Sequence, residues 1–102
     1  MNATEILLAA RAKVEAGWCQ GIYTEAMDAA GNVVDPTSDD ACRWCMLGGI
    51  KAVADNYHQV HAAYEFLKQA IPSGPVAWQE NPERTHSEVL AAFDRAVELS
   101  RE

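Results

Sequence analysis

Apolar residues recur at helical spacing in three segments of the chain. The three sets are Ile6, Leu7, Ala10 and Val14; Tyr57, Val60, Tyr64, Leu67 and Ile71; and Val89, Leu90, Phe93 and Val97. Residues three or four positions apart share one face of a helix, so each set predicts an amphipathic helix with one buried face. Asn56 marks the start of the second of these helices, and Pro72-Ser73-Gly74-Pro75 ends it.

Polar residues mark the ends of the other two helices. Asn2 is followed three residues later by Glu5, and Thr85 is followed at the same distance by Glu88. A polar cap with an acid at this spacing indicates the start of a helix. Gly17 is suited to end the first helix. We therefore expect one helix between Asn2 and Gly17 and another from Thr85 nearly to the C-terminus.

A further helix is predicted within residues 36–55. Ser38 or Asp39 is suited to cap it, and acidic residues are favourable at the positive end of a helix dipole. Residues 44–50 carry no charge, which is typical of a helix surrounded by the rest of a domain. Gly48-Gly49 costs the helix roughly 1 kcal/mol per glycine relative to alanine, so we expect close backbone packing there.

The pattern between Trp18 and Pro36 favours extended chain. Ile22-Tyr23-Thr24 suits a strand, residues 28–32 resemble a turn, and Val33-Val34 can return as a partner strand. We predict a short β-hairpin here. An isolated two-stranded ribbon is marginal in water, so the hairpin must lie against the helices.

The predicted elements define one small, mainly α domain of the α+β type. A chain of 102 residues that is 49% hydrophobic can bury one core, so we expect a single domain over residues 1–102. The expected fold has about four helices in a compact bundle, with the β-hairpin between the first and second helices. Residues 76–84 are predicted to form a loop that buries Trp78.

Charge and cysteine content narrow the function classes. Fifteen acidic and eight basic residues give a formal charge of -7, and the basic residues are scattered along the chain. Nucleic-acid binding needs clustered basic residues, so it is disfavoured. No run of 18 apolar residues and no secretory signal is visible, which argues against a membrane role or secretion. Three cysteines, an odd number, are typical of reduced thiols, so we expect a cytoplasmic protein.

Three groups of residues carry a family resemblance. They are residues 17–21 (Gly-Trp-Cys-Gln-Gly); residues 34–36 leading into 43–49 (Arg-Trp-Cys-Met-Leu-Gly-Gly); and residues 78–85 followed by 88–90 and 93–96. Together they resemble a family of small uncharacterised bacterial and phage proteins classed only as a domain of unknown function. The resemblance implies an accessory protein of a bacterial or phage genome, and it brings no known activity, substrate or cofactor.

The chain departs from this family pattern in two places. Gln79, Glu80 and Glu83 replace the family's Trp-Asn-Asp start and Pro-Gly-Arg-Thr turn. The missing glycine implies that the turn at Glu83 forms without a positive φ, or that the local geometry differs. Cys45 matches a Trp-Cys pair of the pattern, whereas Cys42 does not, which weakens any function that requires both thiols.

A zinc site is a minor alternative. Cys42, Cys45, His58 and His61 approach the spacing of a Cys2His2 site. Four zinc ligands must converge on one ion, however, and Cys45 would lie about 15 Å before the end of a helix that runs to Asp55. Only a helix break at Gly48-Gly49 would bring the four together. We therefore favour buried thiols and partly exposed histidines, with no bound cofactor.

Two catalytic interpretations are weaker still. Cys42 and Cys45 have the spacing of a dithiol redox motif, but no βαβ pattern precedes them, and nearby acids such as Asp39 would raise a thiol pKa. Acid–base chemistry would draw on the last loop. Its candidates are Glu80, Arg84, His86 and Glu88. They form no complete nucleophile constellation, so we assign no catalytic residue and expect a protein that is not an enzyme.

The tryptophans offer a ligand-binding alternative. Trp18, Trp44 and Trp78 fall at predicted junctions between elements and, with Arg84, could bound a cleft for a small molecule, in a ligand-binding protein or an enzyme. Tryptophans more often serve as core residues that tie down a loop, and we favour that interpretation.

Partner binding is the leading functional hypothesis. The stripe of Tyr57, Tyr64, Leu67 and Ile71 is wide enough for the core and for a second protein. The partner would be another protein or a second copy of the chain, since two-fold dimers are common. We leave these two partners open.

Overall fold

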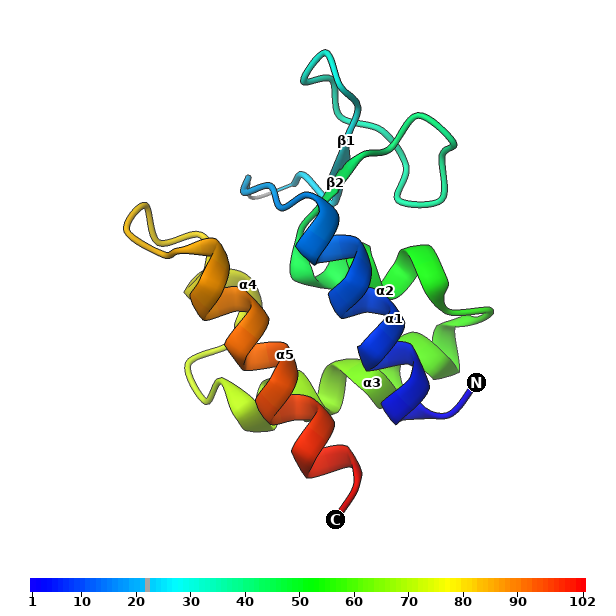
Figure 1. Cartoon of the computed structure of the whole chain (residues 1–102), viewed down its shortest axis with the longest axis vertical. Helices are drawn as coiled ribbons and strands as arrows, with labels where there is room; N and C mark the ends of the chain where they lie inside the picture. The colour runs from blue at the N-terminus through cyan, green and yellow to red at the C-terminus, as the bar shows by residue number, and fades with distance from the viewer. Residues whose placement is uncertain (22) are drawn as a thin grey trace.

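The computed structural model describes residues 1–21 and 23–102, and this part of the chain forms five helices and one antiparallel pair of short strands. The elements are α1 (Ala3–Ala16), β1 (Ala26–Met27), β2 (Arg43–Trp44), α2 (Met46–Val53), α3 (Tyr57–Ala70), α4 (Pro75–Gln79) and α5 (His86–Ser100). Figure 1 shows the strands and residues 28–42 at one end of the molecule, beyond the C-terminal end of α1. The mainly α prediction with a short β-ribbon is confirmed.

Helix α1 is at the centre of the packing. It contacts α2, α3 and α5, and α3 also packs on α5. Two hydrogen bonds show that α1 and α5 run antiparallel. Thr4 near the start of α1 is 2.6 Å from Ser100 at the end of α5, whereas His86 Nε2 at the start of α5 donates to the Val14 carbonyl at 2.7 Å. The predicted apolar faces of α1 and α5 meet in the core.

Both predicted capping boxes are confirmed. The Asn2 side chain accepts from Glu5 N, and the Glu5 side chain accepts in return from Asn2 N. Thr85 and Glu88 make the same reciprocal pair at the start of α5. Each box satisfies N–H groups that the first turn of a helix leaves without partners. The extent of α3 also agrees with the predicted helix between Asn56 and Pro72.

The predicted return of residues 33–34 is present, but the main strand partner of the ribbon differs from the prediction. Ala26 pairs with Trp44 and Met27 with Arg43, so β1 is joined to a strand beyond a long loop. Val33 forms an antiparallel bridge with Met27, and Val34 N donates to the Ala26 carbonyl at 3.1 Å. Thr24 lies outside the strand, and Ile22 lies outside the described residues. Strand pattern alone does not select the partner, and here buried Trp44 packs on the core while it pairs with β1.

Helix α2 begins eight residues after the predicted cap at Ser38. The polar residues before it form local turns: Asp35 Oδ1 accepts from Thr37 N at 2.9 Å, and Ser38 Oγ accepts from Asp40 N at 3.2 Å. Such side-chain bonds compete with helix caps. The observed cap is Cys45, whose Sγ accepts from Gly48 N at 3.3 Å.

The expected close packing at the two glycines is confirmed. A Cβ added to Gly48 would lie 1.8 Å from the carbonyl oxygen of Glu25, and one added to Gly49 would lie 2.9 Å from Val14 Cγ2. Real Cβ atoms do not approach backbone oxygen so closely. The glycines therefore let α2 rest directly on α1 and on the chain before β1.

Helix α4 was not predicted. It lies in the expected loop of residues 76–84, spans only five residues, and begins with Pro75 at its first position. A short helix has too few positions to show a periodic pattern. Trp78 in α4 is half-buried. No helix among the described residues is long and apolar enough to cross a membrane.

Candidate functional site

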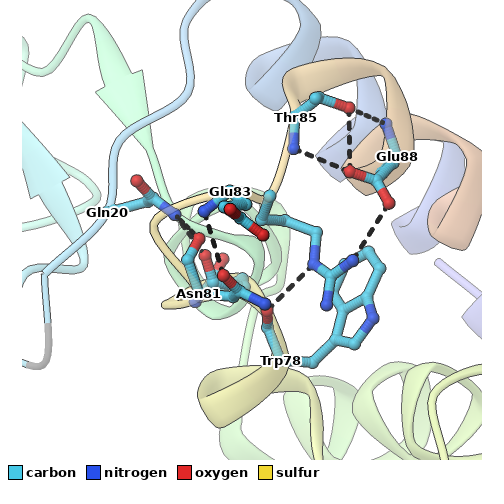
Figure 2. A network of polar contacts seen from close by, with 8 residues as sticks. Gln20, Trp78, Asn81, Glu83, Thr85 and Glu88 are labelled. Carbon is cyan, nitrogen blue, oxygen red and sulfur yellow. Dashed lines mark hydrogen bonds and ion pairs between the residues drawn. The ribbon is translucent and has the colours of Figure 1, made fainter.

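The segment after α4 is fastened to the segment after α1 by hydrogen bonds (Figure 2). Gln20 Nε2 donates to the carbonyl oxygens of Gln79, at 2.5 Å, and Asn81, at 3.0 Å. Gly21 N donates to Glu80 Oε2 at 2.7 Å. We call residues 20–21 together with residues 78–88 the polar junction. Its contacts join two loops that are about sixty residues apart in sequence.

Arg84 makes several contacts within residues 78–88 of the polar junction. Its guanidinium carbon lies 3.8 Å above the Trp78 ring, and its Nε donates to the Trp78 carbonyl at 3.0 Å. Its Nη1 also donates to Glu88 at 3.0 Å. Hydrogen bonds from Thr85 and the nearby guanidinium lower the pKa of the Glu88 carboxyl. Arg84 therefore connects α4 to the N-terminus of α5.

Gln79 extends the polar junction to α2. It is 2% exposed, and its Oε1 accepts from Met46 N, in the first turn of α2, at 3.0 Å. Cys45 caps the same turn, and burial raises the pKa of its thiol. Burial likewise raises the pKa of the Cys19 thiol to about 11. A raised pKa disfavours the Cys45 thiolate at neutral pH, which argues against the dithiol redox interpretation of Cys42 and Cys45.

The four predicted ligand-binding residues form two contacting pairs. Trp78 and Arg84 stack on each other. Trp18 stacks on the His86 ring, with centroids 5.8 Å apart, and forms an isolated backbone bridge with Trp44. The Trp44 indole N–H donates to the Pro36 carbonyl at 3.1 Å. These contacts support the interpretation of the tryptophans as residues that tie down loops.

Two polar atoms of this region lack partners within the described part of the chain. They are Trp18 Nε1 and Glu80 Oε1, and both atoms are buried from solvent. Other groups of these two side chains do make contacts: the Trp18 ring stacks on His86, and Glu80 Oε2 accepts a hydrogen bond from Gly21 N.

The structure separates the predicted zinc ligands. Cys42 is exposed just before β2, Cys45 is buried at the start of α2, and His58 and His61 are exposed on α3. Across residues 1–21 and 23–102, no three His, Cys, Asp or Glu side chains are close enough to hold a metal ion. The four residues thus do not form the convergent set that zinc requires.

A pocket of about 250 Å³ lies elsewhere, between α2 and α3. Its lining residues are Leu47 and Lys51 of α2, and Tyr57, Val60, His61, Tyr64, Glu65 and Lys68 of α3. We call these eight residues the α2–α3 groove. None of Trp18, Trp44, Trp78 and Arg84 lines it.

The predicted aromatic stripe divides at the groove. Tyr57 and Tyr64 line it, whereas Leu67 and Ile71 are buried in the core. The helical pattern did not predict the α2 side of the groove, because that side depends on how α2 packs. The two lysines were visible as charges that flank the tyrosines, although the pattern did not connect Lys51 to α3.

Aromatic rings and ion pairs define the chemistry of the α2–α3 groove. The Tyr57 and His61 rings meet edge to face with centroids 5.3 Å apart. Lys51 Nζ lies 2.6 Å from Glu25 Oε2, and Lys68 Nζ lies 3.1 Å from Glu65 Oε1. Burial raises the pKa of the Tyr64 hydroxyl, so it stays neutral. The groove therefore combines aromatic walls with charged rims.

Comparison with known proteins assigns the chain to a family. The model of a family of unknown function, DUF6197, matches residues 1–99. The chain belongs to this family. No curated protein and no solved structure is similar enough to match it. The DUF6197 match confirms the resemblance to a family of unknown function, and it covers both the polar junction and the α2–α3 groove.

Proposed function

We propose that the protein is a non-enzymatic binding module whose α2–α3 groove receives an apolar or aromatic side chain of another protein. The observation that carries this proposal is Tyr57, which lines the groove although it is 71% exposed. Its ring contributes little to the core. Tyrosine is enriched at protein interfaces because it adds a large apolar area together with one polar group.

The size of the groove favours an anchor side chain. Pockets that enclose drug-sized ligands usually measure about 300–1,000 Å³, whereas this groove measures about 250 Å³. One or two side chains of a partner fit that space. Interface energy commonly concentrates in a few such anchors.

The proposal includes two points that the sequence motivates. We place the module in the cytoplasm, where its three free cysteines would remain reduced. We also retain the accessory role in a bacterial or phage genome that the family resemblance implies.

The experiment is a selection of binders from a phage-displayed library of random peptides. We expect enriched peptides to shift the backbone amide NMR signals of Leu47, Tyr57 and Tyr64. Tyr57→Ala should weaken their binding by about tenfold, as loss of an interface anchor does. Tyr23→Ala is the matched control because Tyr23 is 92% exposed outside the groove, and it should change binding less than about twofold.

Three outcomes would overturn the proposal. They are a selection that enriches no peptide, enriched peptides whose signals map outside the α2–α3 groove, and equal effects of Tyr57→Ala and Tyr23→Ala.

A further inference from the structure

The α2–α3 groove differs in charge from the rest of the molecule. Its lining contains two lysines and one glutamate, which gives a formal charge of +1, whereas the whole chain carries -7. The remaining residues therefore carry -8. When Glu25, the partner of Lys51, is counted with the lining, the groove is neutral. A carboxylate thus meets less repulsion here than on an average part of this surface.

Both lysines retain donors for a second carboxylate. Each ammonium group has three N–H donors. Within the described residues, Lys51 donates to Glu25 alone and Lys68 to Glu65 alone. The Lys51 and Lys68 side chains are 37% and 51% exposed. Their other N–H groups can therefore reach a ligand without loss of the existing ion pairs.

The groove has the length of a short helix. Tyr57 begins α3 and Lys68 lies in its last turn, with His61 and Tyr64 between them. Eleven residues of helix rise about 16 Å. A partner helix of that length presents apolar residues at i, i+4 and i+7 along one face, which is the usual arrangement for a helix that binds a groove.

A second copy of the chain suits this groove poorly. A two-fold dimer places the same surface patch on both subunits. Grooves that face each other would pair two surfaces of the same formal charge, +1 from their lining residues. Two hollow surfaces would also leave their aromatic walls unfilled.

We infer that the occupant of the α2–α3 groove is an amphipathic helix of another protein, with apolar anchors between Tyr57 and Tyr64 and acidic side chains that accept hydrogen bonds from Lys51 and Lys68. This inference rests on the proposed function and adds the chemistry of the partner. The overall charge of -7 repels an acidic partner at long range, but salt at physiological strength screens that repulsion beyond about 8 Å.

The test repeats the peptide selection on three proteins. They are the unmodified chain, the Lys51→Gln/Lys68→Gln variant, and the Arg95→Gln/Arg101→Gln variant. The last variant is the matched control because it removes two exposed cations near the end of α5. Melting temperatures verify that all three proteins are folded. Peptides selected on the unmodified chain and on the control should contain excess Asp and Glu beside their apolar residues.

The lysine variant should lose this acidic excess. Acidic peptides selected on the unmodified chain should bind it about fivefold more weakly, since exposed charge pairs contribute modestly. Groove-binding peptides without acidic excess would overturn this inference and leave the proposed function intact. A dimer that Tyr57→Ala dissociates in sedimentation analysis would also overturn it. Absence of any groove-binding peptide would instead contradict the proposed function itself.

Discussion

The polar junction and the α2–α3 groove differ in how fully their side chains are bound within the chain. At the polar junction, Gln79 completes the first turn of α2, and Arg84 is stacked, hydrogen-bonded and ion-paired within its own chain. At the groove, Tyr57 remains largely in water, and Lys51 keeps unused donors. Residues that carry the family resemblance are therefore engaged within the fold, whereas side chains of the α2–α3 groove keep exposed surface.

Helix α2 contacts both regions, since Met46 N donates to Gln79 and Leu47 lines the groove, and substitutions in this helix should give the largest contrast in stability. Gly48→Ala places a Cβ against the Glu25 carbonyl, and backbone cannot move aside as a side chain can. We expect a loss of about 3 kcal/mol in the free energy of unfolding, measured by urea denaturation. Leu47→Ala on the groove side should cost less. Similar losses for both variants would contradict the close packing of Gly48 against the Glu25 carbonyl.

Loss of the buried hydrogen-bond acceptor of Gln79 should give the next largest decrease in the free energy of unfolding. Gln79→Leu keeps the side-chain size but leaves the buried Met46 N–H without its partner, which should cost about 2 kcal/mol. Gln69→Leu is the control because Gln69 is exposed on α3, and it should change stability by less than about 0.5 kcal/mol. Equal values by urea denaturation would show that the Gln79 bond contributes little.

Features set by residues close together in sequence could be predicted, whereas contacts between distant residues could not. Asn2 with Glu5 and Thr85 with Glu88 are three residues apart, so the sequence shows each capping box directly. The strand partner of Ala26 and the acceptor for Met46 lie far away in sequence, and no local pattern selects them.

For the same reason, the sequence predicted the α3 side of the groove but not its α2 side. The helical periodicity identified Tyr57 and Tyr64, but it could not distinguish a core position from a groove position. That distinction depends on where α2 packs, and α2 begins at an unusual cap, Cys45, because Arg43 and Trp44 are taken into β2.

The capping box at Glu88 predicts a pH effect at the polar junction. Its folded-state pKa is lowered, so its contribution to stability is complete above the ordinary value of 4.5 and is lost as the pH falls through the folded-state pKa. The melting temperature of the unmodified chain should therefore exceed that of Glu88→Gln by more at pH 7 than near pH 3. An equal difference at both pH values would contradict the role of the ionised carboxylate.

Tyr57→Ala should have the smallest effect on stability. Because Tyr57 is 71% exposed, its loss should change the free energy of unfolding by less than about 0.5 kcal/mol. Phe93→Ala provides the opposite reference, since Phe93 is fully buried and its loss should cost about 4 kcal/mol. A large loss for Tyr57→Ala would mean that its ring serves the fold and not a partner.

The central claim is that binding occurs at the α2–α3 groove and not at the polar junction. The most direct test is a two-dimensional amide NMR spectrum of the protein titrated with a peptide from the library selection. The account predicts signal shifts concentrated in Leu47–Lys51 and Tyr57–Lys68, with residues 78–88 unchanged. Shifts concentrated in residues 78–88 would contradict it and would place the binding site at the polar junction.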